Sequence, residues 1–158
     1  MQKITTYLWF DDQAEEAARH YTSIFDNSRI LEIQRYGEAG PGEPGAVMIV
    51  TFELAGQRFI ALNGGPQFPF TEAVSLYVDC ESQEEVDDLW DKLLSGGGEP
   101  TACGWLRDRY GLSWQIIPRR LTDLLTDPDP ARAERAMKAM LKMQKIDIQT
   151  LEDAASGT

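Results

Sequence analysis

The sequence has little histidine, little cysteine and a shortage of positive charge. Its single histidine excludes metal centres built from several histidines, including the HExxH site of zinc proteases. Its two cysteines are too few for a disulfide framework, so we expect a protein of the reducing cytoplasm. Lysine and arginine total 15 against 26 aspartates and glutamates, and the formal charge of −11 argues against nucleic acid and anionic membranes as partners.

Long apolar runs are also missing. No stretch approaches the roughly 18 apolar residues that a membrane-spanning helix needs. The first ten residues contain one lysine and resemble a strand, which is not the pattern of a secretory signal. We therefore expect a soluble protein with no membrane partner, and its 158 residues are enough for one domain with its own core.

The negative charge is confined to one part of the chain. Residues 1–118 contain 8 basic and 19 acidic residues, whereas residues 119–158 contain 7 of each. This change in composition predicts a folded domain over 1–118 and a C-terminal helical extension over 119–158.

The first part of the chain has the pattern of one strand, one helix and three strands. Asp12 and Glu15 predict a capping box at the start of the helix. A loop over 37–45 holds four glycines and two prolines, and Gly56 marks a hairpin turn. The expected strands cover 4–10, 29–36, 46–54 and 58–62, and the helix covers 12–25.

The same order of elements returns in the second part of the chain. Ser82 and Glu85 form a second capping-box pattern, and three glycines over 96–98 end the helix that follows. The expected strands cover 73–78, 101–106 and 113–117, and the helix covers 82–94.

These two parts are related by a repeat. A shift of 68 places Leu8 on Leu76, the helices match at a shift of 69, and a shift of 55 places Gly56 on Gly111. A chance likeness between two amphipathic helices is the alternative, but the order of the elements matches as well. We therefore predict an internally duplicated α+β domain, with two tandem βαβββ units over about 3–65 and 72–118.

Residues 131–144 of the extension are rich in strong helix-forming residues, which predicts a helix. Met137, Met140 and Leu141 form an apolar stripe on it, which indicates core packing or, as the alternative, a methionine-rich binding groove. A basic stripe on the same helix indicates a solvated face or pairing with the acidic helix over 84–91. The basic stripe consists of Arg132, Arg135, Lys138 and Lys142.

Three stretches resemble the PhnB-like branch of the vicinal oxygen chelate superfamily, which includes glyoxalase I, extradiol dioxygenases and bleomycin-resistance proteins. They cover residues 7–11, 61–65 and 103–118, and the last is long and specific. Many sequences of this branch carry the label 3-demethylubiquinone-9 3-methyltransferase. The resemblance covers most of residues 3–118, and the helical extension is also similar to this branch. It implies a cupped, mixed eight-stranded sheet and a homodimer.

The resemblance also implies where a metal ion would be held. The superfamily uses His, Glu or Gln from the first and last strands of each unit, and the corresponding positions here are Thr5, Ile60, Ala73 and Gln115. Ile60 and Ala73 offer no donor atom, and the set contains no carboxylate or imidazole, the ligands that divalent cations prefer. We therefore predict no metal site and no cofactor.

A metal-free cavity for a small-molecule ligand remains as the predicted site. Strand alternation turns Leu8 and Phe10 toward the helix, so Thr5, Tyr7 and Trp9 face the cavity. Aromatic walls with a few polar groups suit a small, planar or partly apolar molecule. The predicted wall residues are Tyr7, Trp9, Ser75, Tyr77, Cys103, Trp105 and Gln115.

Two of these wall residues are candidates for chemistry. Cys103 is a candidate nucleophile if a cation such as Arg107 activates its thiol, and a small packed thiol is the simpler interpretation. Gln115 is a candidate for holding a ligand oxygen, with satisfaction of strand backbone groups as the equal alternative.

Three functions stay open at this point. The first is a binding protein for a small molecule, and the second is an enzyme on the same cavity, such as a methyltransferase, isomerase or lyase. The third is a dimeric interaction protein that uses the extension. The link over 11–13 lacks the glycine-rich turn typical of S-adenosylmethionine enzymes, so the sequence does not support the methyltransferase label.

Overall fold

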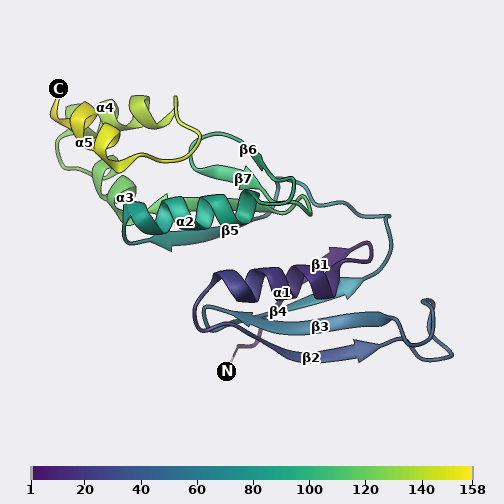
Figure 1. Cartoon of the computed structure of the whole chain (residues 1–158). Coiled ribbons are helices and arrows are strands. Elements are labelled where there is room, and N and C mark those ends of the chain that lie inside the picture. Colours follow the sequence, from purple (N-terminus) through teal and green to yellow (C-terminus); the bar gives the residue numbers. More distant parts are fainter. Residues whose placement is uncertain (1, 158) are drawn as a thin grey trace. The chain divides into compact units, whose positions relative to one another are not determined.

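The structure, a computed structural model, describes residues 2–157 and divides into two compact units. Unit 1 ends at Phe70 and unit 2 begins at Thr71. Figure 1 shows a four-stranded sheet in each unit, with one helix lying along one face of it. The eight strands that the family resemblance implies are therefore present as two sheets of four, and the two βαβββ units of an α+β fold are confirmed. The sequence pattern places seven of these strands and does not place the short strand at Glu99–Pro100.

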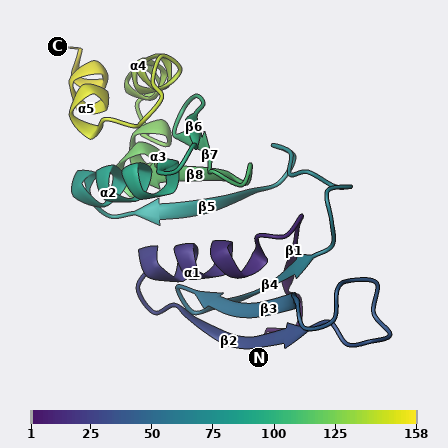
Figure 2. The ribbon, with the colours of Figure 1, turned by 45° about the vertical axis from the view of Figure 1, so that its right-hand side comes forward.

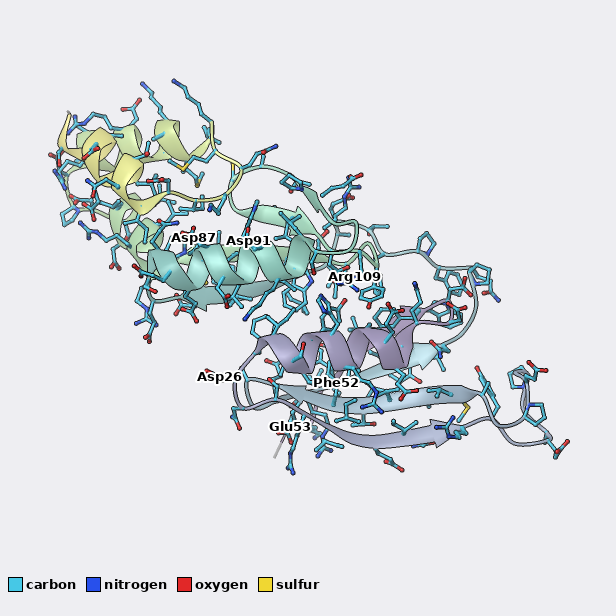
Figure 3. The ribbon with its side chains drawn as sticks, in the orientation of Figure 1. Asp26, Phe52, Glu53, Asp87, Asp91 and Arg109 are labelled. Atoms are coloured by element: carbon cyan, nitrogen blue, oxygen red, sulfur yellow. The ribbon has the colours of Figure 1, made fainter. Side chains whose placement is uncertain are left out.

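Unit 1 orders its strands β1-β4-β3-β2, with β1 parallel to β4 and the other neighbours antiparallel. Its helix buries a stripe at i, i+3, i+4 and i+7 that consists of three alanines and Tyr21. Phe52, labelled in Figure 3, points from β3 toward this helix, and its ring centroid lies 6.4 Å from that of Tyr21. The elements are β1 (Thr6–Phe10), α1 (Ala14–Ile24), β2 (Arg29–Arg35), β3 (Val47–Leu54) and β4 (Gln57–Asn63).

Unit 2 repeats this topology with the strand order β5-β8-β7-β6. The strand expected over 101–106 is wrong in its bounds, because residues 101–104 form a turn in which Cys103 has φ 58° and Gly104 has φ 87°. Left-handed backbone interrupts a strand. The elements are β5 (Ser75–Cys80), α2 (Gln83–Leu94), β6 (Glu99–Pro100), β7 (Trp105–Arg107) and β8 (Ser113–Pro118).

The two helices of the repeat begin differently. The Ser82 hydroxyl accepts a hydrogen bond from the Glu85 amide at 3.1 Å, and the Glu85 carboxylate accepts one from the Glu81 amide at 2.7 Å, as a capping box predicts. The capping box expected from Asp12 and Glu15 is wrong. The residue before α1 makes no side-chain cap, and the Asn63 side chain from β4 caps the helix instead.

The extension belongs to unit 2 and forms three helices, α3 (Arg119–Leu125), α4 (Pro130–Met140) and α5 (Ile148–Ser156). Figures 1 and 2 show them gathered at the end of the second sheet where β5 and β8 finish. They enclose a small core that includes Ile117, Ile146 and Leu151. The sequence pattern predicts one helix over 131–144 and does not predict α5.

The two stripes of the expected helix have mixed roles. Met140 packs against the small core of the extension, as expected of a core residue, whereas Met137 and Leu141 are exposed. The Arg135 guanidinium donates to the carbonyl oxygens of the last turn of α5. The ion pair with the acidic helix is made by Lys145, which lies 2.9 Å from Asp87. Figure 3 labels Asp87 on α2.

Among residues 2–157, no helix combines the length and the apolar character needed to cross a membrane.

Candidate functional site

Each sheet has a helix on one face, and we call the opposite face its open face. Tyr7 in unit 1 and Tyr77 in unit 2 project from the open faces and are 53% and 54% exposed. Tyr7 lies opposite Ile60 in the parallel β1–β4 pair, and Tyr77 lies opposite Gln115 in the parallel β5–β8 pair. The open face of each unit therefore has a tyrosine beside its central strand.

This register corrects the repeat that the sequence pattern suggests for the first strands. Ile60 and Gln115 are related by the shift of 55, so their partners Tyr7 and Tyr77 are related by a shift of 70 and not 68. The counterpart of Thr5 is then Ser75, while Ala73 lies in the turn before β5. A slip of two residues keeps every side chain on its own face, so alternation alone does not detect it.

Gln115 occupies the centre of the open face of unit 2. Tyr77 on β5 and Trp105 on β7 are its direct neighbours across the sheet. The Gln115 side-chain amide donates to the Ser75 hydroxyl at 3.0 Å. The structure thus brings together four of the seven predicted wall residues in unit 2, and they form a polar pair between two aromatic side chains.

The charged side chains beside this group are paired. Arg107 on β7 donates to Glu72 at 3.2 Å and to Glu99 at 2.6 Å. The Asp79 carboxylate accepts from Arg119 at 2.8 Å, and this bond raises the pKa of the Arg119 guanidinium. Three carboxylates thus face two guanidiniums beside Gln115, and this net negative charge disfavours an anionic ligand.

Cys103 lies in the turn before β7 and not on a strand of the open face. Its backbone amide donates to the Met143 carbonyl at 2.8 Å, which ties the turn to the extension. The guanidinium proposed to activate its thiol, that of Arg107, is engaged by two carboxylates. The second cysteine, Cys80, is fully buried, and burial raises the pKa of its thiol to about 12. The sulfur chemistry of the site has no structural support beyond the partial exposure of Cys103.

Tyr7 and Trp9 lie on unit 1, and Trp9 is held by its own unit. Its indole N–H donates to the Gly65 carbonyl at 2.8 Å, and the Phe68 ring meets it edge-on at 4.8 Å. A methyl group at Gly64 would overlap the Trp9 ring, so this position requires glycine. Gly64 and Gly65, which contribute to the family resemblance, therefore hold Trp9 in place: the first leaves room for its ring and the second accepts its hydrogen bond.

The metal positions of the superfamily do not fit a divalent cation in this chain. With the corrected register they hold Thr5, Ile60, Ser75 and Gln115, which supply two hydroxyls and one amide. The amide is already hydrogen-bonded to one of the hydroxyls. Within residues 2–157, no three side chains of His, Cys, Asp or Glu are grouped so that they could hold a metal ion.

Unit 1 also contains a hollow of about 530 Å³ at the start of α1. Its lining residues include Asp11, Asp12, Glu15 and Tyr36. Tyr7 and Trp9 are not among its lining residues, so the hollow is distinct from the predicted cavity.

Sequence reasoning missed the structural role of Asp108. This carboxylate is 4% exposed and accepts from the Tyr110 amide at 2.9 Å, the Leu112 amide at 3.1 Å and the Trp114 indole at 2.9 Å. It thereby holds the turn that leads into β8, which is the strand that carries Gln115. The signal available in the sequence was an aspartate two residues before a tyrosine and three before a glycine, typical of an Asx turn.

Comparisons with known proteins agree with this architecture. Residues 2–117 match the family model described as 3-demethylubiquinone-9 3-methyltransferase. A PhnB protein from Bacillus cereus, whose name carries the same label, is 45% identical, with 74% of this chain and 99% of that chain covered and a TM-score of 0.68. The search among curated proteins found no match.

More distant structures show the fold alone. A protein from Pseudomonas aeruginosa is 19% identical, with coverage of 75% and 98% and a TM-score of 0.60. A fosfomycin resistance protein from Listeria monocytogenes is 16% identical, with coverage of 75% and 93% and a TM-score of 0.51. The family match stops at residue 117, just before the extension. The chain belongs to the 3-demethylubiquinone-9 3-methyltransferase family, whose label its PhnB relative also carries.

Proposed function

We propose that this protein binds a small, partly apolar or aromatic molecule on the open face of unit 2 without a metal ion. The observation that supports the proposal is the position of Gln115 between Tyr77 and Trp105, with its amide oriented by Ser75. Aromatic side chains next to a fixed polar group are typical of small-molecule sites. They give apolar contact area, while the amide sets the orientation of the ligand.

The geometry assigns different tasks to the neighbours. Tyr77 is 54% exposed, so its ring is available to a ligand. Trp105 is half-buried and forms the opposite side of the group. The Gln115 amide nitrogen is directed to Ser75, which leaves the amide oxygen to accept a hydrogen bond from a ligand.

The test is an NMR titration of the full chain with 2-naphthol, a neutral aromatic probe. We expect saturable shifts of the Gln115 side-chain amide and the Trp105 indole signals, with weaker binding in Gln115→Leu. Gln34→Leu, an exposed position on β2 of unit 1, is the matched control and should bind as the wild type does. If the probe shifts no signal of the open face of unit 2, the proposal is wrong.

The family description favours a second candidate, a methyltransferase. The residues present do not fit the common S-adenosylmethionine site, because residues 11–13 contain no glycine and the first amide of α1 is occupied by Asn63. Isothermal titration with S-adenosylmethionine separates the two candidates: we expect no saturable heat, and stoichiometric binding would favour the enzyme.

We further propose that the protein is a cytoplasmic homodimer. The resemblance to the superfamily supports the dimer, and the two free cysteines, one of them fully buried, support a reducing compartment. Light scattering after size exclusion is expected to give twice the chain mass of 17.7 kDa. A monomer mass at micromolar concentration would contradict the dimer.

A further inference from the structure

We propose that Ser75, Ser113 and Gln115 form a neutral subsite for an uncharged ligand hydroxyl, at the place where the superfamily holds a metal ion. The inference deepens the proposed function and rests on it, because it names the ligand group that the open face of unit 2 recognises. It also adds Ser113, which the sequence pattern does not single out.

Ser113 is the first residue of β8 and is 1% exposed. Its side-chain oxygen is buried and has no hydrogen-bond partner among the described residues. Buried hydroxyls are nearly always hydrogen-bonded, so an unpartnered one indicates a group that the chain itself does not supply. The Ser113 hydroxyl is therefore available to form a hydrogen bond with a polar group of a ligand.

The register places Ser113 next to the Gln115 group. It lies directly opposite Ser75 on β5 and, like Gln115 two residues later, belongs to the open face of the sheet. The two serines face each other across the parallel pair, and Gln115 is bonded to one of them. Three polar side chains thus occupy neighbouring positions on the face that carries Tyr77 and Trp105.

The hydrogen-bond capacity that remains defines the ligand group. Ser75 accepts from Gln115, so its own O–H hydrogen is free to donate to a ligand. Ser113 has both its hydrogen and its lone pairs available. A ligand hydroxyl both accepts and donates, so it can accept from Ser75 and donate to Ser113. A carbonyl or an ether satisfies only half of this pair.

Charge selects against anionic ligands. The neighbours of the subsite on the same face are Arg107, directly opposite Ser113 on β7, and Asp79 on β5. Arg107 is paired with Glu72 and Glu99, and Asp79 is paired with Arg119. A carboxylate ligand would meet a guanidinium already shared by two acids, on a face where acidic groups outnumber basic ones.

Benzyl alcohol and toluene, which differ by one hydroxyl group, test the subsite. NMR titrations of the full chain give the dissociation constant of each probe from the Gln115 and Trp105 side-chain signals. We expect benzyl alcohol to bind about three- to tenfold more tightly than toluene, the range that one or two net hydrogen bonds provide. Ser113→Ala should bring the affinity for the alcohol closer to that for toluene, because only the Ser75 hydrogen bond remains, and should leave the affinity for toluene unchanged. Ser23→Ala in unit 1 is the control, and Ser75→Ala is the second variant if Ser113→Ala misfolds.

The outcomes separate the subsite from the proposed function. Equal affinities for the two probes in the wild type, or an alcohol affinity that Ser113→Ala does not change, would overturn the subsite and leave the aromatic binding face intact. Absence of binding by both probes on this face would overturn both proposals. Addition of Mn²⁺ gives an independent check, because selective broadening of the Gln115 amide signal would show that the position still takes a cation.

Discussion

The side-chain oxygen of Asn63, the last residue of β4, accepts a hydrogen bond from the backbone N–H of Ala14, the first residue of α1, at 2.8 Å. The nitrogen of the same side chain donates to the Val47 carbonyl at 3.1 Å. One amide group therefore joins the start of the helix to β3 and β4. It satisfies a helical N–H that has no partner within the helix itself.

Loss of this cap should destabilise unit 1. We expect Asn63→Ala to lower the free energy of unfolding by about 1–2 kcal/mol, the usual cost of removing an N-cap side chain. Asn63→Asp keeps the acceptor next to the positive end of the helix and should cost less. Urea unfolding followed by circular dichroism measures both variants. An Asn63→Ala variant as stable as the wild type would show that the cap contributes nothing.

A second prediction concerns Asp108, whose two carboxylate oxygens receive three N–H donors. Asp108→Asn should be destabilised by about 1–3 kcal/mol, because an amide NH₂ would face the Trp114 indole N–H or a backbone N–H and leave a buried donor unpaired. Asp88→Asn, on the exposed side of α2, is the control and should change stability by less than about 0.5 kcal/mol. Guanidinium unfolding with tryptophan fluorescence distinguishes them, and equal stability of the two variants would contradict this role for Asp108.

The sequence predicted local features better than distant ones. The cap at Ser82 was predicted because its partner is three residues away, whereas the Asn63 cap joins residues 49 positions apart. Strand alternation identified the face of Tyr7 correctly. Because side chains alternate with a period of two, however, shifts of 68 and 70 between the two units place every side chain on the same face, and alternation does not distinguish them. The backbone of Cys103 was missed because non-glycine residues rarely adopt positive φ. The short helix α5 is fixed by packing against the extension core, which periodicity over nine residues does not reveal.

The two thiols should react at different rates. Cys80 is 0% exposed and the pKa of its thiol is raised to about 12, first by burial and then by the nearby Glu85 and Asp79 carboxylates. At pH 8 we expect a disulfide reagent such as DTNB to titrate one thiol per native chain and two in denaturant. Cys103→Ser should abolish the fast reaction. A fast reaction in that variant would mean that Cys80 is accessible.

The raised pKa of the Cys80 thiol should also make the free energy of unfolding depend on pH. An unburied cysteine thiol has a pKa near 9.0, whereas the pKa of Cys80 is about 12 in the fold, so the folded state favours the protonated form. Above pH 9 the unfolded chain loses this proton first, and the stability contributed by the buried thiol falls as the pH rises from 9 toward 12. Cys80→Ala should flatten that part of the stability profile relative to Cys103→Ala. Parallel profiles for the two variants in urea unfolding between pH 8 and 11 would contradict this role of the buried thiol.

The final prediction concerns Gln83, which attaches the extension to α2. Its side-chain oxygen accepts from the Ile148 amide at 2.8 Å, and its side-chain nitrogen donates to the Ile146 carbonyl at 3.0 Å. Next to it, Lys145 lies 2.9 Å from Asp87, and its hydrogen bond holds the pKa of the Asp87 carboxyl below its usual value. Both contacts join the segment before α5 to the acidic helix.

Gln83→Ala should free the Ile148 amide, and its hydrogen exchange should accelerate about tenfold, while amides of α1 in unit 1 keep their wild-type rates. Gln149→Ala removes an exposed contact with Asp153 within α5 and is the matched control. Acid should also weaken the attachment of the extension. The stability provided by the Asp87 carboxylate is present above the pKa of this group in the unfolded chain, and it is lost as the pH falls through the lowered pKa of Asp87 in the fold. Protection of Ile148 that is unchanged in Gln83→Ala would show that the small core around Ile146, and not the Gln83 side chain, holds the extension in place.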